Sequence, residues 1–278
     1  MARNIFDYII EDKLPFFWCE GCGNGIILKA IARAFADLNL DPREIVVVTG
    51  IGCWGKADDY LSVNSLHVTH GRALPAATGV KAVNPNLKVL ALMGDGDGLT
   101  IGGNHFIHAA RRNIDITTII SNNFNYGMTG GQVSGTTPEN SITSTSRFGS
   151  VEPPFDVVKL AIASGASYVA RATVFHVNLL EKYIKNAIMK RGFSVVDVIN
   201  ICPTYYGRLN QMKTPVEMME FLKNNSTFKQ DEGDVNLRKF ALGEFVNIEK
   251  PDFSTKYLEI QKQAREKLSS LEQDAGAR

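Results

Sequence analysis

Short runs of β-branched and apolar residues alternate with stretches of helical spacing, and this alternation limits the folds open to the chain. The strand-like runs are 45–48, 89–93, 116–121 and 195–199. The helix-like stretches are 25–37, 74–83, 101–111, 157–163 and 179–190. Nearly continuous apolar runs are typical of strands that are buried on both faces. We therefore predict an α/β fold with a doubly wound, mostly parallel sheet.

The length of 278 residues and the hydrophobic content of 44% suit one large α/β domain with appendages. We assign residues 1–203 to this domain, which carries a cysteine-bearing N-terminal loop, and residues 204–278 to a C-terminal extension that contacts another subunit. Within the extension, 223–234 reads as a polar surface connection and 254–273 as an amphipathic helix. The side chains expected to face inward from this helix are Leu258, Ala264, Leu268 and Leu271.

Charge and hydropathy exclude two classes of partner. Lys and Arg together number 30 against 29 for Asp and Glu, so no net field attracts nucleic acid or anionic lipid. No window approaches the roughly 18 apolar residues of a membrane span. We expect a soluble, cytoplasmic protein that binds neither nucleic acid nor membrane.

Two glycine-rich loops follow predicted strands, at 49–52 and 94–98. In doubly wound sheets ligands bind beyond the carboxyl ends of the strands, so both loops should face one crevice. Glycine lacks a side chain and lets a diphosphate approach the main chain closely. The residues predicted to contact such a ligand are Ile51, Gly52, Cys53, Gly96 and Asp97.

Oxygen-bearing side chains end two of these strands. Asp95 follows one strand, and Asn123 and Asn125 follow the next strand along the chain. Carboxylate, amide and main-chain oxygens are the ligands that Mg²⁺ prefers. We predict that Asp95, the Asn123 amide and the Asn125 carbonyl hold Mg²⁺. The alternative is that both segments are only tight turns, where these residue types are also common.

Four cysteines are too few for a disulfide framework in a chain of this size. They are Cys19, Cys22, Cys53 and Cys202. The Cys-x-x-Cys spacing suits zinc or an iron–sulfur cluster, and Cys202 precedes a proline, as cluster ligands often do. Four thiols match one [4Fe-4S] cluster, while structural Zn²⁺ and unpaired buried thiols remain open as alternatives.

The Gly94-Asp95-Gly96 turn with the later Asn123 resembles the signature of the thiamine diphosphate enzymes, in the domain that binds the diphosphate. The segment 127–132 looks like the loop that these enzymes place beside the diphosphate. This resemblance implies that Gly127 and Met128 also contact the cofactor, and that the domain 1–203 binds thiamine diphosphate.

A wider set of motifs resembles the β subunit of the 2-oxoacid:ferredoxin oxidoreductases, from about Cys19 to Cys202. The motifs are Trp18-Cys19-Glu20-Gly21-Cys22-Gly23, Gly50-Ile51-Gly52-Cys53, Thr69-His70-Gly71-Arg72-Ala73-Leu74-Pro75 and Gly94-Asp95-Gly96-Asp97. The resemblance implies thiamine diphosphate, Mg²⁺ and a single [4Fe-4S] cluster on this chain. A separate α subunit, or a fused γα subunit, would supply the pyrimidine-binding domain, so this chain alone should be inactive.

The implied reaction is oxidative decarboxylation of a 2-oxo acid to an acyl-CoA, with electrons passed through the cluster to ferredoxin; the reverse reductive carboxylation is also open. His70 is a candidate for contacting the diphosphate or handling protons, and an ordinary structural histidine is its alternative. Lys56 is a candidate for binding the distal carboxylate of 2-oxoglutarate, and a solvated lysine beside Asp58 and Asp59 is the alternative.

Other functions fit parts of this pattern. The substrate could be pyruvate or a branched-chain 2-oxo acid rather than 2-oxoglutarate. The chain could also belong to a non-redox thiamine diphosphate decarboxylase or carboligase with structural zinc. An electron-transfer or assembly subunit that has lost thiamine binding is a third alternative, against which the intact Asp95, Asn123 and Asn125 argue.

Overall fold

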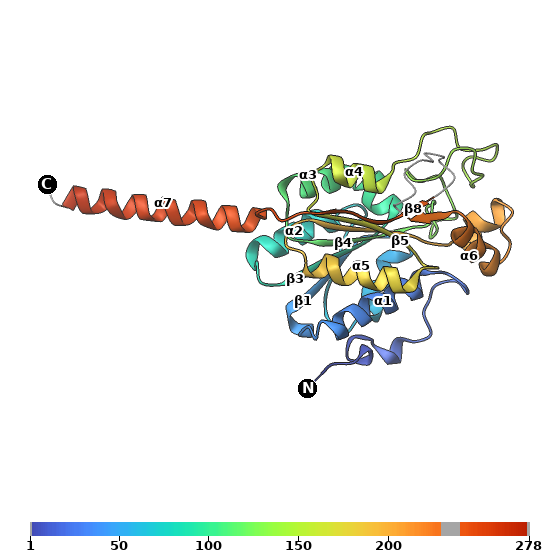
Figure 1. Cartoon of the computed structure of the whole chain (residues 1–278), viewed down its shortest axis with the longest axis horizontal. Coiled ribbons are helices and arrows are strands. Elements are labelled where there is room, and N and C mark those ends of the chain that lie inside the picture. The colour runs from blue at the N-terminus through green and yellow to red at the C-terminus, as the bar shows by residue number, and fades with distance from the viewer. Residues whose placement is uncertain (1, 229–239, 277–278) are drawn as a thin grey trace.

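A central sheet of eight strands runs through the computed structural model, which describes residues 2–228 and 240–276 (Figure 1). In order across the sheet, the strands are β2 (Asn64–His67), β1 (Ile45–Thr49), β3 (Lys88–Gly94), β4 (Thr117–Asn122), β6 (Ser194–Ile199), β5 (Tyr168–Thr173), β8 (Phe240–Asn247) and β7 (Ser226–Phe228). The first six strands are parallel. β8 pairs antiparallel with β5 and parallel with β7.

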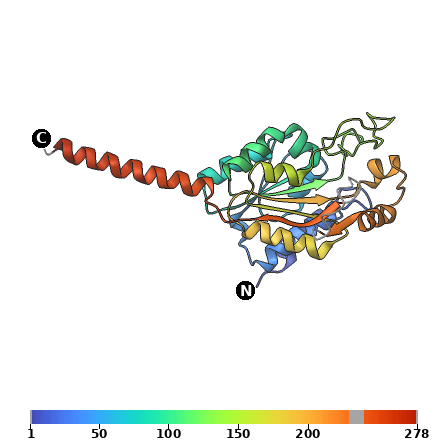
Figure 2. The ribbon, with the colours of Figure 1, turned by 45° about the horizontal axis from the view of Figure 1, so that its top comes forward.

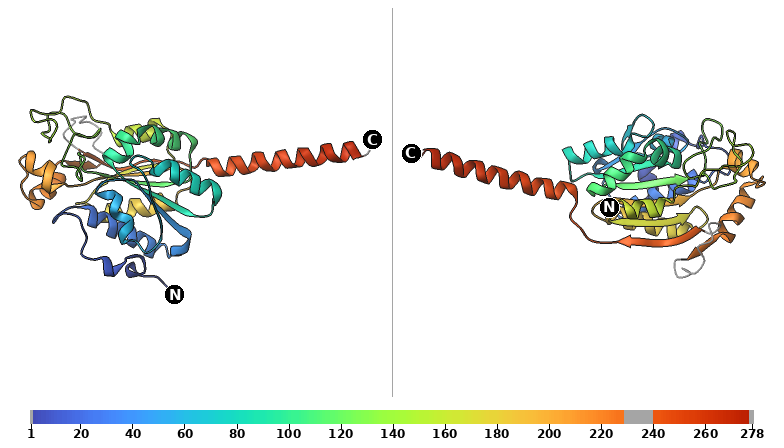
Figure 3. Two further views of the ribbon diagram at one scale, coloured as in Figure 1. Left: turned by 180° about the vertical axis from the view of Figure 1, so that it is seen from behind. Right: turned by 90° about the horizontal axis from the view of Figure 1, so that it is seen from above.

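Helices cover both faces of the sheet (Figures 1 and 3). One face carries α1 (Asn24–Asp37) and α5 (Val177–Met189), and the other carries α2 (Ala73–Val83), α3 (Gly103–Arg112) and α4 (Val157–Ala163). Side chains of β3 alternate between the two cores: Leu90 and Leu92 join the first, and Ala91 and Met93 the second. Strands buried on both faces explain the continuous apolar runs, and the predicted doubly wound α/β fold is confirmed.

The four predicted strands and five predicted helices all form, with ends shifted by a few residues. β5 and β8 were not predicted from the sequence. β5 carries Arg171 in its middle, which breaks the apolar pattern, but the guanidinium is buried and paired with acidic side chains. β2 was also missed because it is a short, solvent-exposed edge strand without an apolar face.

The predicted polar connection at 223–234 is wrong in its first part. Its first residues end helix α6 (Pro215–Asn224), and β7 follows almost directly. Residues 229–234 lie outside the described part of the chain. α6 begins with a capping box, in which Thr214 and Glu217 each accept a hydrogen bond from the other's main-chain N–H.

The C-terminal helix α7 (Phe253–Gly276) projects away from the body of the molecule (Figures 1 and 2). The helix itself was predicted, but the inward orientation of its apolar residues is wrong. Leu258 and Leu268 are 52% and 60% exposed, and Ala264 is exposed too. The helix continues past the end of the sheet, where the described chain offers no surface to cover it. The side chain of Leu271 lies outside the described residues.

Over the residues described, the structure contains no helix with the length and apolar character needed to cross a bilayer. β7 and β8, which belong to the predicted extension, complete the same sheet as the preceding strands. The functional part of the fold is the carboxyl edge of β1, β3, β4 and β6, because these parallel strands release their following loops on one side.

Candidate active site

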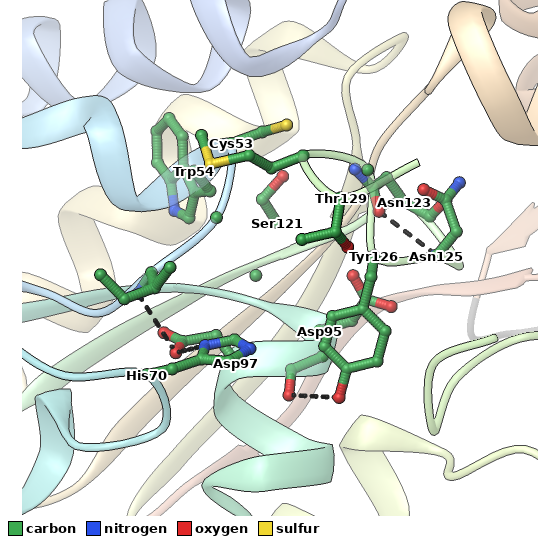
Figure 4. Close-up of a pocket in the computed structure, with 16 residues that line it drawn as sticks. Cys53, Trp54, His70, Asp95, Asp97, Ser121, Asn123, Asn125, Tyr126 and Thr129 are labelled. Atoms are coloured by element: carbon green, nitrogen blue, oxygen red, sulfur yellow. Dashed lines mark hydrogen bonds and ion pairs between the residues drawn. The ribbon is translucent and has the colours of Figure 1, made fainter. Parts of the chain in front are cut away.

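A pocket of about 550 Å³ lies at this carboxyl edge (Figure 4). Residues that the sequence predicted are among its lining: Ile51, Gly52, Cys53, His70, Asp95, Gly96, Asp97, Asn123, Asn125, Gly127 and Met128. Gly94 and Thr129, which belong to the predicted motifs at 94–98 and 127–132, also line the pocket, whereas Trp54, Ser121 and Tyr126 were not predicted to do so. Two glycine-rich loops and the segment after β4 therefore do face one crevice.

Asp95 sits directly after β3 and is 1% exposed. Its Oδ2 atom accepts hydrogen bonds from the hydroxyls of Ser134 and Thr136, the latter at 2.6 Å. Burial raises the pKa of Asp95 to about 6, although both hydroxyls oppose the rise. The two hydroxyls hold one carboxylate oxygen and leave Oδ1 to face the pocket. They come from a loop about forty residues downstream, a Ser-Gly-Thr-Thr run that carries no recognisable metal-site signal.

Three oxygen atoms converge beside Asp95. The amide oxygen of Asn123 lies 3.2 Å from Asp95 Oδ1 and 2.8 Å from the main-chain oxygen of Asn125. Neighbouring ligands of an octahedral ion with bonds of about 2.1 Å lie roughly 3 Å apart, so this spacing suits Mg²⁺. If the Asn123 amide turned over, its N–H groups would instead donate to both oxygens, which is the arrangement expected without a cation.

The Asn125 side chain does not join this group, because its Nδ2 donates to the main-chain oxygen of Asn123 at 3.2 Å. The main-chain oxygen of Asn125 is the one that lies beside the Asn123 amide, whereas Asn125 Oδ1 is buried without a hydrogen-bond partner among the described residues. In the described parts of the chain, no three or more His, Cys, Asp or Glu side chains are grouped so as to hold a metal ion.

His70 and Asp97 form a close pair on the opposite side of the pocket (Figure 4). The distance from His70 Nδ1 to Asp97 Oδ1 is 2.6 Å, and the Gly71 N–H donates to the same oxygen at 2.6 Å. Burial raises the pKa of Asp97, and the Gly71 and His70 hydrogen bonds oppose this. A carboxylate beside Nδ1 favours a proton on that nitrogen, which leaves Nε2 for the pocket. Asp97 Oδ2 is buried and has no hydrogen-bond partner among the described residues.

Gly96 begins a π-helical turn, η5 (Gly96–Ile101), a feature that recurs at functional sites. A Cβ atom at Gly96 would lie 2.3 Å from Tyr126 Cε1. The tyrosine hydroxyl donates to the Gly96 carbonyl at 3.3 Å, and its ring stands edge-on to His70. Gly96 is therefore required for the packing of Tyr126 as well as for access of a ligand to the main chain.

The four cysteines are free thiols and lie within range of one another's charges. Burial, reinforced by the neighbouring thiols, raises the pKa of Cys22 to about 12 and that of Cys53 to about 11. Cys202 is buried and Cys19 is exposed. Cys53 also lines the pocket, and a methyl group at Gly127 would lie 3.4 Å from its Sγ atom. The cysteine group and the loop after β4 thus meet at one wall of the pocket.

The structure does not bring Lys56 into the described pocket lining. Lys56 lies on the short helix η4 (Trp54–Tyr60), where its ammonium group pairs with the Asp59 carboxylate. This pairing raises the pKa of Lys56, and the side chain is 38% exposed. Trp54, from the first position of the same helix, faces the pocket instead. A role for Lys56 in substrate selection stays a prediction.

Comparison with known proteins agrees with this geometry. Residues 47–198 match the family described as thiamine pyrophosphate enzyme, C-terminal TPP binding domain. The 2-oxoglutarate synthase subunit KorB of Methanocaldococcus jannaschii is 47% identical over 250 residues, which cover 88% of this chain and 93% of the relative. KorB of Archaeoglobus fulgidus is 50% identical over 225 residues, 81% of this chain and 82% of the relative.

Subunit β of a 2-oxoacid:ferredoxin oxidoreductase of Aeropyrum pernix is 41% identical over 205 residues, 74% of this chain and 66% of the relative. A solved structure is similar as well: 2-oxoglutarate:ferredoxin oxidoreductase from Magnetococcus marinus with 2-oxoglutarate, coenzyme A and succinyl-CoA bound. Its TM-score is 0.85 at 28% identity, over 97% of this chain and 96% of that chain. The chain therefore belongs to the β subunits of the 2-oxoacid:ferredoxin oxidoreductases, within the thiamine diphosphate enzymes.

Proposed function

We propose that this chain is the β subunit of a 2-oxoglutarate:ferredoxin oxidoreductase, which converts 2-oxoglutarate and coenzyme A to succinyl-CoA and CO₂ and passes electrons to ferredoxin. The observation that carries the proposal is the shared pocket wall, where Cys53 lies beside the loop after β4, which adds Asn123 and Asn125 to the oxygen group with Asp95. A diphosphate site and a cysteine group in contact suit a decarboxylation that is coupled to electron removal. The names of the relatives support 2-oxoglutarate.

Asp95 Oδ1, the Asn123 amide oxygen and the Asn125 carbonyl would hold Mg²⁺, and the cation would bind the diphosphate. Ser134 and Thr136 occupy the other oxygen of Asp95, so the carboxylate would serve as a single-oxygen ligand. Thiamine diphosphate, when bound, supplies the nucleophilic carbon and the electron sink for decarboxylation.

Asp97 would orient the His70 imidazole by accepting a hydrogen bond from its Nδ1–H group. His70 would then direct Nε2 at the diphosphate end of the cofactor, where it can accept or hold a proton. Ile51, Gly52, Gly96, Gly127 and Met128 shape the wall around this end of the pocket. The close contact between Gly96 and Tyr126 keeps the main chain in place as the ligand binds.

Cys19, Cys22, Cys53 and Cys202 would ligate one [4Fe-4S] cluster. In such a cluster each iron takes one cysteine, so four thiols from separate segments can serve together. Buried thiols with pKa values near 11 to 12 are poor nucleophiles when free, and coordination by iron would deprotonate them. Because Cys53 lines the pocket, the electrons would leave the cofactor over a short distance.

A partner α or fused γα subunit would cover the mouth of the pocket and supply the pyrimidine-binding domain. The loop between β4 and α4 exposes apolar side chains that suit such an interface: Phe148 is 104% exposed, Val151 90% and Phe155 51%. We also propose that residues 1–203 hold the cofactors and that the extension 204–278, whose β7 and β8 complete the same sheet, contacts a partner. The four free thiols suit the reducing cytoplasm, where we place the complex.

The test is purification of the complex with its partner subunit in the absence of oxygen, followed by assays with ferredoxin and coenzyme A. We expect iron and sulfide in equal amounts, bound thiamine diphosphate, and a kcat/KM that is highest for 2-oxoglutarate in a panel with pyruvate and branched-chain 2-oxo acids. A higher kcat/KM for pyruvate would contradict the assignment of 2-oxoglutarate as the substrate. Zinc in place of iron, without ferredoxin reduction, would overturn the redox function.

A further inference from the structure

A buried polar network connects the cysteine loop with the floor of the pocket. Its members, Asn24, Ser121 and Asn200, are each at most 1% exposed. Asn24 begins α1 two residues after Cys22, and Asn200 lies two residues before Cys202. Ser121 belongs to β4 and lines the pocket. The network therefore lies between the cysteine group and the pocket.

The hydrogen bonds in this network determine the orientation of both amide groups. Asn24 Oδ1 accepts from Ser121 Oγ at 2.8 Å and from Asn200 Nδ2 at 2.7 Å. Asn200 Nδ2 also donates to Ser121 Oγ at 2.8 Å, and Asn200 Oδ1 accepts from the Ile201 N–H at 2.7 Å. Asn200 must turn its nitrogen towards Asn24, so Asn24 must turn its oxygen towards Asn200.

The amide nitrogen of Asn24 consequently points away from the network, and it has no hydrogen-bond partner among the described residues. The Asn24 side chain is 0% exposed. Leaving a buried N–H donor without an acceptor costs about 1–3 kcal/mol of folding free energy. Because two hydrogen bonds to Oδ1 fix the orientation of the Asn24 amide, its nitrogen points at a place where an acceptor is expected.

The residues around Asn24 indicate where the acceptor for its side-chain N–H group would lie. The main-chain N–H of Asn24 lies close enough to the Cys22 thiol to oppose the rise in the pKa of that thiol. The preceding Gly23 packs directly against the network, since a Cβ atom at this position would lie 2.0 Å from Asn200 Oδ1. Figure 4 shows Ser121 on the same side of the pocket as Cys53, away from His70. The unused N–H group thus lies among the segments that carry the cysteines.

We infer that the Asn24 side-chain amide donates a hydrogen bond to a sulfur atom of the [4Fe-4S] cluster, and that Ser121 and Asn200 hold the amide in this orientation. The inference rests on the cluster in the proposed function. A hydrogen bond to a cluster sulfur stabilises the additional negative charge of the reduced form and raises the reduction potential. Asn24 is then a positioning residue that adjusts the electron acceptor without contacting the substrate.

The experiment uses the complex with its partner subunit, with asparagine labelled by ¹⁵N at the side-chain amide. Pulsed electron paramagnetic resonance of the reduced cluster is expected to show a ¹⁵N coupling in the natural sequence and to lose it in Asn24→Asp and Asn24→Leu. A redox titration should give a lower midpoint potential in both variants. A tenfold change in the reduction equilibrium corresponds to 59 mV for one electron. Asn24→Leu introduces no charge, so a shift in both variants reports the lost hydrogen bond.

The matched control is Thr118→Val, on the same strand as Ser121. The Thr118 hydroxyl is also buried without a partner among the described residues, but it lies at the other end of β4. Its removal should change neither the potential nor the coupling. If both Asn24 variants fail to fold, the natural complex still decides, because absence of the ¹⁵N coupling overturns the inference. An unchanged potential in an iron-loaded Asn24 variant overturns it too. Absence of iron from the natural complex overturns the proposed cluster instead.

Discussion

Several side chains of the site are held by neighbouring residues that do not themselves bind the ligand. These neighbours determine which atom of each side chain faces the pocket. Asp95 presents one oxygen because Ser134 and Thr136 occupy the other. His70 presents Nε2 because Asp97 binds Nδ1. These supporting contacts matter as much as the groups that touch a ligand, since they set the orientation of each side chain and the nitrogen of the imidazole that carries the proton.

The first prediction concerns the pair of His70 and Asp97. Asp97→Asn keeps the size of the side chain but removes the carboxylate that fixes the Nδ1 proton, so the imidazole can turn over. We expect thiamine diphosphate to bind the assembled complex about tenfold more weakly or worse, as measured by calorimetric titration. Asp58→Asn is the control, because Asp58 contacts His67 at 3.4 Å outside the pocket lining. Equal losses in the two variants would contradict a specific role for Asp97.

The second prediction concerns Lys56. If its ammonium group binds the distal carboxylate of 2-oxoglutarate in the assembled enzyme, Lys56→Ala raises KM for 2-oxoglutarate more than for pyruvate. A lost charged hydrogen bond of about 1.5–3 kcal/mol corresponds to a change of roughly ten- to a hundredfold. Asp59→Asn, which releases Lys56 from its ion pair, should leave KM for 2-oxoglutarate unchanged or lower it. Equal effects of Lys56→Ala on both substrates would show that Lys56 is only a surface residue.

At the scale of elements, the long loop between β4 and α4 carries both site residues and exposed apolar residues, and its shape depends on distant partners. Asn210, which follows η6 (Pro203–Gly207), binds the main chain of Ile142 in both directions. The Ile142 N–H donates to Asn210 Oδ1 at 2.8 Å, and Asn210 Nδ2 donates to the Ile142 carbonyl at 2.9 Å. The segment after Cys202 thus holds the loop that supplies Ser134 and Thr136.

We therefore expect Asn210→Ala to release the middle of this loop. Hydrogen exchange at residues 140–146 should become faster, while exchange in the central strands stays unchanged, because the lost bonds lie at the surface. Asn225→Ala is the comparison, since the Asn225 side chain donates to the Phe221 carbonyl at the end of α6. If Asn225→Ala accelerates exchange at 140–146 to the same degree, the link between Asn210 and the loop is not responsible.

The end of the loop is secured by Asp156, which caps α4. Its Oδ1 atom accepts the Val158 N–H at 2.9 Å and an Arg171 N–H at 2.6 Å. Arg171 and these hydrogen bonds lower the pKa of Asp156 despite its burial. A carboxyl whose pKa is lower in the folded state stabilises the fold above its unfolded pKa of about 3.9, and this stability is lost as the pH falls through the folded pKa.

Asp156→Asn should lower the free energy of unfolding by about 1 kcal/mol at neutral pH, because the amide can still cap α4 but lacks the charge that pairs with Arg171. The difference from the natural sequence should begin to shrink below the unfolded pKa of about 3.9, where the unfolded chain takes up the proton, and should disappear once the pH lies below the lowered folded pKa. Denaturant titrations at pH 7 and pH 3.5 measure both values. A difference that is independent of pH would assign the effect to packing rather than to the carboxylate.

At the scale of the whole molecule, two features point to an assembly. The loop between β4 and α4, which begins at the carboxyl edge of the sheet, exposes Phe148 and Val151, and α7 projects from the opposite part of the body (Figure 1). Exposed apolar side chains next to a ligand pocket are typical of a surface that a second subunit covers.

The last prediction tests this surface. The double variant Phe148→Ser and Val151→Ser should weaken association with the α or fused γα subunit by at least tenfold, because two large apolar groups lose their burial. Retention of the partner on an affinity-tagged β subunit measures this. Val83→Ser is the control, as Val83 is 87% exposed at the end of α2, away from the carboxyl edge. Equal retention by all three proteins would place the interface elsewhere.

The sequence by itself determined the sheet and much of the pocket lining. Strands buried on both faces are mostly apolar and β-branched, so β1, β3, β4 and β6 were recognisable from local composition. A glycine-rich turn has a spacing set by local geometry. For that reason Asp95 and Gly96 in one such turn, and Cys53 directly after another, were found from their sequence neighbours alone.

Only the tertiary structure decided which side chains complete the site. Ser134 reaches Asp95 and Asn24 reaches Asn200 across large separations in the sequence, and such contacts leave no local pattern. Likewise, the turn of η4 directs Trp54 into the pocket while Lys56 pairs with Asp59. Local spacing specifies an element and the loop that ends it. The direction of a side chain from that loop depends on which distant hydrogen-bonding groups the fold brings against it.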